Sequence, residues 1–344
     1  MLFRRLLPGA AGKIMRETSS ECPAHLDPLV FCMTLQPLTL FGPQRLEPCL
    51  REELDFRGIS GSVAAITAGW QEREAENDEL QEHLGRPVVD LRLHSRADAV
   101  FEEDPELFGA HRARQDRLQA LQKLYRFRLE FTLEAARQLL RREGDEDFLE
   151  PARREAIEAV RLLDQQHLER IAAVHREFDE RWAPRYRPSV ARHRAEIAAL
   201  LGRSAAIGIA GGHVAVLLNR MRLFELGDLL RDLPIFAWSA GAMCLGRRIV
   251  LFHDYPPQGP GNAEVFDVGL GLYHGLLALP HASQRLRLHD PARIRLLARR
   301  FSPDLCVALD SRVSIRLENG AWRRGQNTRH LTVDGQVLDW EQAA

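Results

Sequence analysis

The sequence has few cysteines, and no two of them are close enough in the chain to form a metal-binding or redox motif. There are five, Cys22, Cys32, Cys49, Cys244 and Cys306, with no CxxC motif among them. An odd, scattered set argues against a disulfide framework and against a zinc cluster held by cysteines. We therefore expect a cytoplasmic protein without a metal, and no motif indicates an organic cofactor.

Long apolar runs and an excess of one charge are also missing. No segment approaches the roughly 18 apolar residues that a membrane-spanning helix needs. The 47 lysine and arginine residues balance 48 aspartate and glutamate residues, which gives a net charge of −1. A balanced chain has no overall field that would attract nucleic acid or an anionic membrane. We expect a soluble globular protein that binds neither.

Residues 1–33 lack the continuous apolar segment and the small-residue cleavage site of a secretory signal peptide. The first convincing strand begins only after Met33. We expect residues 1–33 to be either a disordered tail or an over-extended gene start. Residues 34–344 are expected to form a single α/β hydrolase-type domain.

From Thr34 onward, short apolar runs alternate with amphipathic stretches. Such alternation is typical of a parallel sheet covered by helices on both faces. It predicts an α/β fold with a doubly wound, mostly parallel sheet. Strands are expected at 38–41, 62–68, 88–93, 205–209, 234–238, 248–252, 275–279, 305–309, 313–317 and 328–333, and helices at 47–56, 77–84, 214–224 and 240–245.

An inserted α-helical hairpin is expected at 104–199, where arginine, glutamate, glutamine, leucine and alanine dominate and 142–145 breaks the pattern. Apolar residues repeat at heptad spacing on both arms, with Asp164 and His167 between them on the second arm. The two arms either pack only on each other or also pair across a homodimer, and polar residues such as Asp164 could set the register in both cases. The apolar residues are Leu118, Leu121, Tyr125 and Leu129 on the first arm, and Ile157, Val160, Ile171, Val174 and Phe178 on the second.

Ser239 stands between an apolar strand and a helix of small residues, in the run Pro-Ile-Phe-Ala-Trp-Ser-Ala-Gly-Ala-Met. A nucleophile elbow needs this pattern, because a sharp turn lifts the hydroxyl above the sheet and only small neighbours let the backbone close beneath it. The NH of Ala240 at the helix start would face a developing oxyanion. The alternative interpretation is that Ser239 is a plain helix N-cap.

A base and a second oxyanion donor are available after other expected strands. His281 follows the strand at 275–279, and the carboxyl ends of strands are where α/β sheets gather catalytic groups. The segment Ile-Ala-Gly211-Gly212-His213 follows a strand and opens a helix, so its bare amides could serve as oxyanion donors. The alternative is a tight turn that needs glycine for its positive φ.

Together these segments resemble the dipeptidase E and cyanophycinase family of serine peptidases, which has the class I glutamine amidotransferase-like fold. The resemblance spans about residues 205 to 320. It consists of the glycine pair before His213, the elbow at 237–242, the Gly-Leu-Gly-Leu run at 269–272, His281 with the Gln-Arg-Leu-Arg stretch at 284–287, and Asp310 at a strand start. Their order and spacing together are far more specific than any single motif.

The resemblance implies that Ser239 is the nucleophile, His281 the general base, and the NH groups of Ala240 and of Gly211 or Gly212 the oxyanion hole. Two acids remain open. Asp254 stands where dipeptidases have an aspartate, and Asp310 stands beside the position of the glutamate of cyanophycinase-like members; we prefer Asp254. Substrate contacts are expected from His213, Gln284, Arg285 and Arg287, of which the arginines could bind a carboxylate.

The chain departs from the family pattern at several positions. Ala237 replaces the first glycine of the elbow, His213 an asparagine or threonine, Leu279 and Pro280 an acidic and a polar residue, and Ser311 the glutamate. The preference of the family for an aspartyl group is therefore not carried over.

We expect a serine hydrolase that cleaves a small peptide or an isopeptide through an acyl-enzyme. The alternative is a non-catalytic relative that binds a ligand or a protein partner through the helical insertion. A glutamine amidotransferase would need a cysteine nucleophile, and Cys244 lies about one and a half helical turns beyond the elbow.

Overall fold

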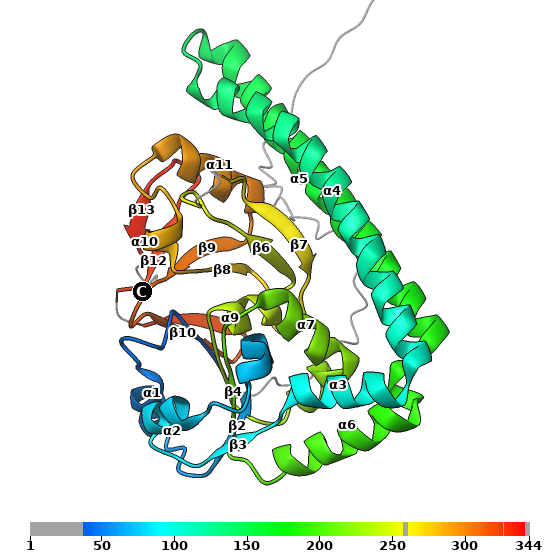
Figure 1. The fold of residues 1–344 in the computed structure, drawn as a ribbon. Helices are drawn as coiled ribbons and strands as arrows, with labels where there is room; N and C mark the ends of the chain where they lie inside the picture. The colour runs from blue at the N-terminus through cyan, green and yellow to red at the C-terminus, as the bar shows by residue number, and fades with distance from the viewer. Residues whose placement is uncertain (1–36, 257–260, 326, 341–344) are drawn as a thin grey trace, which may run out of the picture. The chain divides into compact units, whose positions relative to one another are not determined.

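The buried strands of the chain form a mixed α/β fold with a largely parallel central sheet (Figure 1). The computed structural model describes residues 37–256, 261–325 and 327–340. Residues 1–33, for which we expect a tail or an over-extended start, lie outside the described residues.

Within these residues the central sheet has seven strands, in the order β11-β10-β1-β5-β4-β2-β3. The five neighbouring strands β1, β5, β4, β2 and β3 pair in parallel. Strands β10 and β11 extend the sheet beyond β1 and pair antiparallel. The predicted α/β class is confirmed. The strands are Leu38–Phe41 (β1), Val63–Ile66 (β2), Val88–Asp90 (β3), Ala206–Ile209 (β4), Ile235–Trp238 (β5), Ser314–Glu318 (β10) and Ala321–Arg324 (β11).

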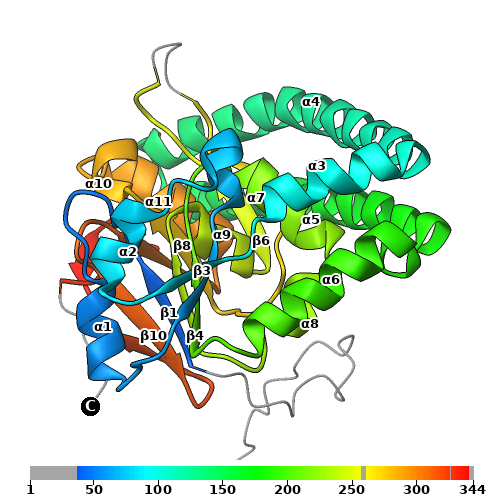
Figure 2. The same ribbon diagram turned by 60° about the horizontal axis from the view of Figure 1, so that its bottom comes forward.

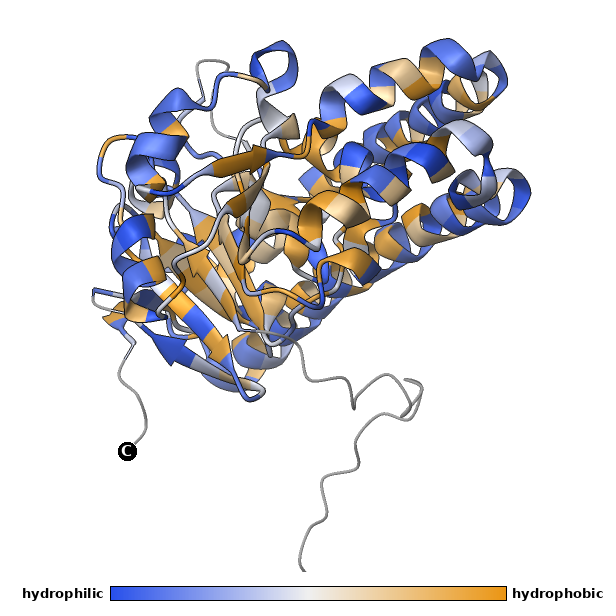
Figure 3. Ribbon diagram, turned by 90° about the horizontal axis from the view of Figure 1, so that it is seen from below, coloured by the Kyte–Doolittle hydropathy of each residue, from blue (hydrophilic) through white to orange (hydrophobic). Residues whose placement is uncertain are grey.

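Both faces of the central sheet are covered, because successive strand residues point to opposite sides. Val63 and Ala65 of β2 belong to an apolar cluster shared with helices α1 (Leu50–Phe56) and α2 (Asp78–Leu84). The intervening Ala64 and Ile66 belong to a second cluster, shared with α7 (Val214–Leu223) and α9 (Ala240–Leu245). Figure 2 shows these helix pairs on opposite sides of the strands, and in Figure 3 hydrophobic strands lie between helices with hydrophilic outer surfaces.

The prediction of one sheet is wrong for several later strands. In the described part of the chain they form a four-stranded sheet in the order β13-β12-β9-β8 and a two-stranded sheet of β6 and β7. An apolar pattern identifies a buried strand but not its partner, which depends on long-range packing. The strands are Arg248–Leu251 (β6), Glu264–Val268 (β7), Leu276–Pro280 (β8), Leu305–Leu309 (β9), Arg329–Leu331 (β12) and Val337–Asp339 (β13).

Two long helices, α4 (Pro105–Arg141) and α5 (Glu146–Trp182), form the two arms expected at 104–199 and lie side by side in Figure 1. Each begins at an aspartate N-cap, since the side chain of Asp104 accepts a hydrogen bond from Leu107 N and that of Asp145 from Asp147 N. The end of the expected insertion is a separate helix, α6 (Pro188–Leu201). The remaining helical segments are η2 (Ala68–Arg73), α3 (Leu93–Glu103), η3 (Pro184–Tyr186), α8 (Leu226–Leu229), α10 (Ala282–Arg285) and α11 (Pro291–Phe301).

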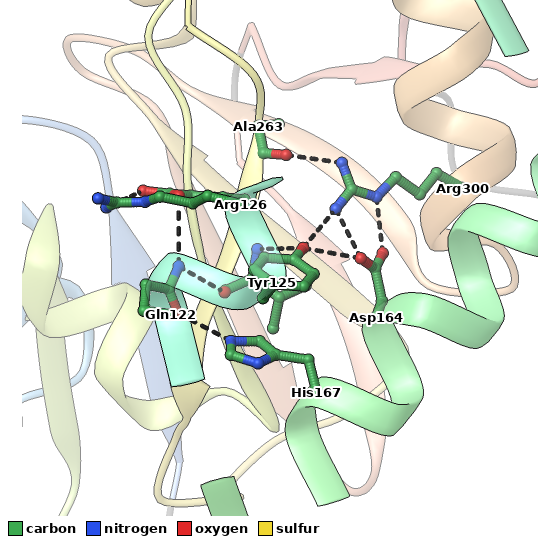
Figure 4. Close-up of polar contacts among 9 residues, drawn as sticks. Gln122, Tyr125, Arg126, Asp164, His167, Ala263 and Arg300 are labelled. Carbon is green, nitrogen blue, oxygen red and sulfur yellow. Dashed lines mark hydrogen bonds and ion pairs between the residues drawn. The ribbon is translucent and has the colours of Figure 1, made fainter. Parts of the chain in front are cut away.

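A buried polar network attaches this helix pair to α11 (Figure 4). Arg300 of α11 donates to both carboxylate oxygens of Asp164, at 2.6 and 2.8 Å, and to Tyr125 Oη at 2.9 Å. His167 stacks on the Tyr125 ring at 3.9 Å between centroids, and its Nε2 lies 2.8 Å from Gln122 Oε1. Asp164, a polar residue of the heptad pattern, therefore connects the helix pair to α11. His167, the other polar residue, connects α5 to α4.

The apolar positions expected on the first arm differ in burial. Tyr125 and Leu129 are buried, whereas Leu118 and Leu121 are only half-buried. The expected homodimer stays a prediction. None of the helices in the described residues is long and apolar enough to cross a lipid bilayer.

Candidate active site

The carboxyl ends of strands from two sheets meet at one place. Gly42, just after β1, approaches the turn after β9 so closely that a Cβ on it would lie 1.8 Å from Asp310 O. Only glycine fits there. His281 N, just after β8, donates to Leu309 O at 3.0 Å. The ends of β1, β5, β8 and β9 are therefore brought together, although they belong to separate sheets.

Ser239 occupies a strained turn between β5 and α9. Its backbone has φ 52° and ψ −122°, which is costly for any residue with a side chain and recurs at functional sites. The turn is tight because Gly241 lies against β4, where an added Cβ would be 2.4 Å from Ile209 O. The Ser239 side chain makes no capping hydrogen bond to α9. The alternative of a plain N-cap therefore does not describe this residue.

His281 faces the serine hydroxyl from the second sheet. Its Nε2 lies 3.1 Å from Ser239 Oγ. Its backbone is left-handed, with φ 58° and ψ 34°, and this turn directs the ring back over the end of β5. In the tautomer with the proton on Nδ1, the serine hydroxyl donates to Nε2, as a general base requires.

The surroundings of His281 keep the imidazole neutral. Its pKa is lowered, chiefly by burial and then by the positive charge of Arg285. A side-chain hydrogen bond with Gln284 and the negative charge of Asp310 act in the opposite direction. A neutral imidazole is the form that can accept the proton of Ser239.

The expectation that Asp254 is the acid paired with His281 is not met by the structure. Asp254 is buried, and its carboxylate accepts hydrogen bonds from Arg293 Nη2 at 2.5 Å, Arg293 Nε at 3.2 Å and Arg287 N at 2.9 Å. A buried carboxylate is best satisfied by such a bidentate arginine. Asp254 therefore holds the turn that follows α10, and among the described residues it makes no hydrogen bond to His281.

Asp310, the alternative acid, acts on His281 only through its charge. Its carboxylate accepts hydrogen bonds from Ser283 N at 2.8 Å, Ser283 Oγ at 2.7 Å and Arg329 Nη2 at 2.9 Å. These bonds hold the start of α10, the helix that begins directly after His281. Gln284 also lies near His281, where a side-chain hydrogen bond raises the pKa of the imidazole.

The glycine pair lies directly against the serine. A Cβ on Gly211 would be 2.7 Å from Ser239 Cβ and 3.5 Å from Ala240 N. Gly212 has φ +108°, a conformation that requires glycine. In the described residues neither glycine NH donates to another backbone group, and Ala240 is the first residue of α9, whose NH has no partner within the helix. Gly211 thus lies beside Ser239 and Ala240, and both glycines line the same pocket as Ser239.

The residues expected to contact substrate divide into two groups. Gln284 and Arg285 lie close enough to His281 to act on its pKa. His213 instead caps α7, since its Nδ1 accepts a hydrogen bond from Val216 N at 3.3 Å. Arg287 lines a different pocket, of about 240 Å³, together with Asp254 and Arg293.

A pocket of about 440 Å³ opens in front of Ser239 and His281. Gly211, Gly212 and Trp238 are among the residues that line it. The rest comes from the first third of the chain, where Trp70 and Leu80 line it and were not predicted from the sequence. Trp70 follows β2 within η2, so its position just after the carboxyl end of a strand was the signal that could have identified it.

Within the described residues, no group of three or more histidine, cysteine, aspartate or glutamate residues could hold a metal ion. Cys244 is buried within α9 and burial raises the pKa of its thiol. It does not occupy the turn that holds Ser239.

Comparisons with known proteins give only a distant likeness. No family model matches the chain, and no curated protein matches it. Among solved structures it is similar to a peptidase from an acI-B1 Actinobacterium, with 13% identity and a TM-score of 0.42 over 91% of this chain and 100% of that one. It is also similar to a candidate peptidase E protein from Listeria monocytogenes EGD-e, with 12% identity and a TM-score of 0.40 over 87% of this chain and 100% of that one.

Proposed function

We propose that this protein is a serine hydrolase that cleaves a peptide or a related amide bond through an acyl-enzyme on Ser239. One observation carries the proposal: Ser239 Oγ lies 3.1 Å from His281 Nε2 on a strained turn that faces a pocket. This is the relation between a nucleophile and its base that acyl transfer needs. The resemblance of residues 205 to 320 to serine peptidases supports the amide class of substrate.

The reaction follows from these positions. His281 Nε2 takes the proton of Ser239 while Oγ attacks the carbonyl carbon. The negative charge on the carbonyl oxygen is held by NH groups of the glycine pair and of Ala240. His281 then gives its proton to the amine, the carbon–nitrogen bond breaks, and an ester on Ser239 remains. Water, deprotonated by the same histidine, cleaves that ester and restores the serine.

In this mechanism the residue that orients His281 is an amide, Gln284, in the place that a carboxylate takes in a serine–histidine–acid triad. We infer that Gln284 orients the imidazole, because a side-chain hydrogen bond with Gln284 raises the pKa of His281, as does the negative charge of Asp310. An amide can orient the ring and fix its tautomer. It stabilises the imidazolium less than a carboxylate would, so Asp310 supplies part of that charge stabilisation.

The test is a burst experiment with an activated acyl ester. Mixing the protein with a 4-nitrophenyl ester is expected to release one equivalent of nitrophenol per protein quickly, followed by slower turnover. Mass spectrometry is expected to find the acyl group on Ser239. Rapid release without an acyl group on the protein would contradict the acyl-enzyme, and absence of both from folded protein would contradict a hydrolase.

A second candidate function is favoured by one observation. Within the described residues no carboxylate is hydrogen-bonded to His281, and Asp254 is instead paired with Arg293. A non-catalytic relative that binds a ligand without cleaving it would be expected to lack a carboxylate partner for His281. In that case a peptide would protect Ser239 from modification but would be recovered intact.

A further inference from the structure

The pocket in front of Ser239 is an opening into one of the two apolar clusters of the fold. Trp238 and Leu80 are 7% and 4% exposed and belong to the cluster between the central sheet and helices α1 and α2. Trp70, partly buried, packs against the same cluster. All three side chains line the pocket. A side chain entering it would therefore contact two indole rings and a leucine.

Each arginine that lines the pocket has a glutamate beside it that lines the pocket too. Arg73 Nη2 lies 2.5 Å from Glu76 Oε2, and the hydrogen bond with Glu76 raises the pKa of Arg73. Arg45 Nε lies 3.8 Å from Glu79 Oε1. These two arginines and two glutamates all line the pocket. A carboxylate from a substrate would find no unpaired arginine among the described residues that line it.

The arginines expected from the sequence to bind a carboxylate do not line this pocket. Arg287 lines the second pocket, and its guanidinium lies 5.6 Å from the Tyr255 ring centroid. Arg285 is close to His281 but is not among the residues around the 440 Å³ pocket. The surroundings of the pocket thus favour a neutral apolar group, because desolvating an unpaired carboxylate is costly.

Trp70 lies on the side of the glycine pair that supplies the proposed oxyanion donors. Gly69 packs against the glycine pair, since a Cβ on it would be 2.5 Å from Gly211 O, and Gly69 O accepts a hydrogen bond from His213 N at 2.7 Å. Trp70 is the next residue. The carbonyl that is attacked has its oxygen at these amides and its leaving amine towards His281. Trp70 therefore stands beside the acyl part of the substrate.

We propose that the pocket selects an apolar, preferably aromatic, side chain on the acyl residue of the substrate, with Trp70 and Trp238 as its walls. The inference rests on the proposed hydrolase function. It assigns the substrate class as peptides or amides whose carbonyl belongs to a residue such as phenylalanine or leucine. An aspartyl side chain is disfavoured at this position, because it would compete with Glu76 and Glu79 for the two arginines that line the pocket.

The test is a series of N-acetylated 4-nitrophenyl esters that differ only in the acyl residue: phenylalanine, leucine, alanine and aspartate. We expect kcat/KM for the phenylalanine ester to exceed that for the alanine ester by about tenfold or more, because a buried phenyl group gains well over the free energy of a tenfold change. The aspartate ester is expected to be the slowest. A series in which the aspartate ester is fastest would overturn the inference.

Variants of Trp70 test whether this residue causes the preference for the phenylalanine ester. Trp70→Ala is expected to lower the ratio of phenylalanine to alanine ester by about tenfold, since it removes one apolar wall. Trp70→Phe, which keeps an aromatic wall and is less disruptive to folding, is expected to retain most of the ratio. Tyr186→Ala is the matched control, because Tyr186 is an aromatic residue that is 80% exposed and is not among the residues that line the pocket. An unchanged ratio in folded Trp70→Ala would overturn the inference.

The same measurements separate this inference from the proposed function. If no ester acylates Ser239, the hydrolase itself fails. If every ester acylates Ser239 with the same efficiency, or the aspartate ester is preferred, the hydrolase stands and the apolar pocket is wrong. A preference for aspartate that Arg73→Gln removes would assign substrate binding to that arginine.

Discussion

Ser239 Oγ and His281 Nε2 lie 3.1 Å apart although the two residues are 42 positions apart in the chain and belong to turns after strands of different sheets. Both residues have positive φ, 52° for Ser239 and 58° for His281. Two strained turns that direct their side chains at each other are difficult to explain by packing alone. Their arrangement supports the proposed roles of Ser239 as nucleophile and His281 as base.

The space beside Ser239 admits no side chain at position 211. Gly211→Ala would place a methyl group 2.7 Å from Ser239 Cβ and 3.4 Å from Oγ. Either the serine or the oxyanion amides must shift, so we expect the rate of Ser239 acylation to fall by about 10²–10³. Gly227→Ala is the matched control, because a Cβ there meets nothing within 4 Å. Equal acylation rates in the two variants would show that the glycine pair has no part in the site.

The rate of acylation is expected to depend on pH through His281. Only the neutral imidazole accepts the proton, so the rate rises with pH through a pKa that lies below the ordinary histidine value. Arg285→Gln removes a charge that lowers this pKa, so the rise moves to higher pH. Asp310→Asn removes a charge that raises it, so the rise moves to lower pH.

Arg128→Gln, an exposed position on α4, serves as the control for this pH series and is expected to cause no shift. The acylation rate constant is measured as a function of pH for the wild type and for these three variants. Shifts of the two site variants in the same direction would contradict the assignment of His281 as the base.

The buried pair of Arg300 and Asp164 is expected to matter for stability. Arg300→Met leaves the carboxylate of Asp164 buried without its bidentate partner, and we expect a loss of about 3–5 kcal/mol in the free energy of unfolding. The double variant Arg300→Met with Asp164→Leu is expected to lose less than the sum of the single losses.

Arg312→Ala is the control for that measurement. Its pair with Glu52 is exposed at both side chains, 51% and 65%, so its removal is expected to cost about 0–1 kcal/mol. Denaturant unfolding compares the variants. A cost for Arg300→Met as small as that of the control would show that the network in Figure 4 does not anchor α4 and α5 to α11.

Acid is expected to destabilise the fold through buried histidines. Burial lowers the pKa of His111 from 6.5 to about 3, and among the described residues its Nε2 has no hydrogen-bond partner. The unfolded chain therefore binds a proton below about pH 6.5 that the folded chain refuses until about pH 3. The stability that His111 contributes is complete above the unfolded pKa and is lost as the pH falls below it.

His111→Phe tests this directly, since the ring of His111 already packs on Phe101 at 5.0 Å and Phe178 at 6.4 Å between centroids. Between pH 6 and pH 4 the wild-type free energy of unfolding should fall more steeply than that of the variant, by about 1.4 kcal/mol per pH unit, which corresponds to one proton. Parallel curves for the two proteins would contradict a neutral buried His111.

Much of the site could be predicted because its pattern is local. The small residues after Ser239 predict the tight turn, and the structure shows Gly241 against Ile209 O for that reason. The glycine pair follows a strand whose length and apolar composition are clear. These signals depend on neighbours in the sequence, and steric limits on the backbone make them specific.

The rest depends on contacts that the sequence does not encode locally. Asp254 stands where the dipeptidases have an aspartate, but in the structure its carboxylate pairs with Arg293, 39 positions further along the chain. The strand before His281 was predicted, yet its membership of a second sheet was not, because one buried strand resembles another. Trp70 was missed because an aromatic residue after a strand is more often part of a core than of a pocket.

The central claim, that His281 activates Ser239 as a nucleophile, is tested most directly by labelling with a fluorophosphonate. In that reaction Oγ attacks phosphorus, fluoride leaves, and His281 accepts the serine proton. We expect folded wild-type protein to gain one phosphonyl group on Ser239, Ser239→Ala to gain none, and His281→Ala to react about 10²–10⁴ times more slowly. Folded wild-type protein that stays unlabelled, or that reacts no faster than His281→Ala, would contradict the claim.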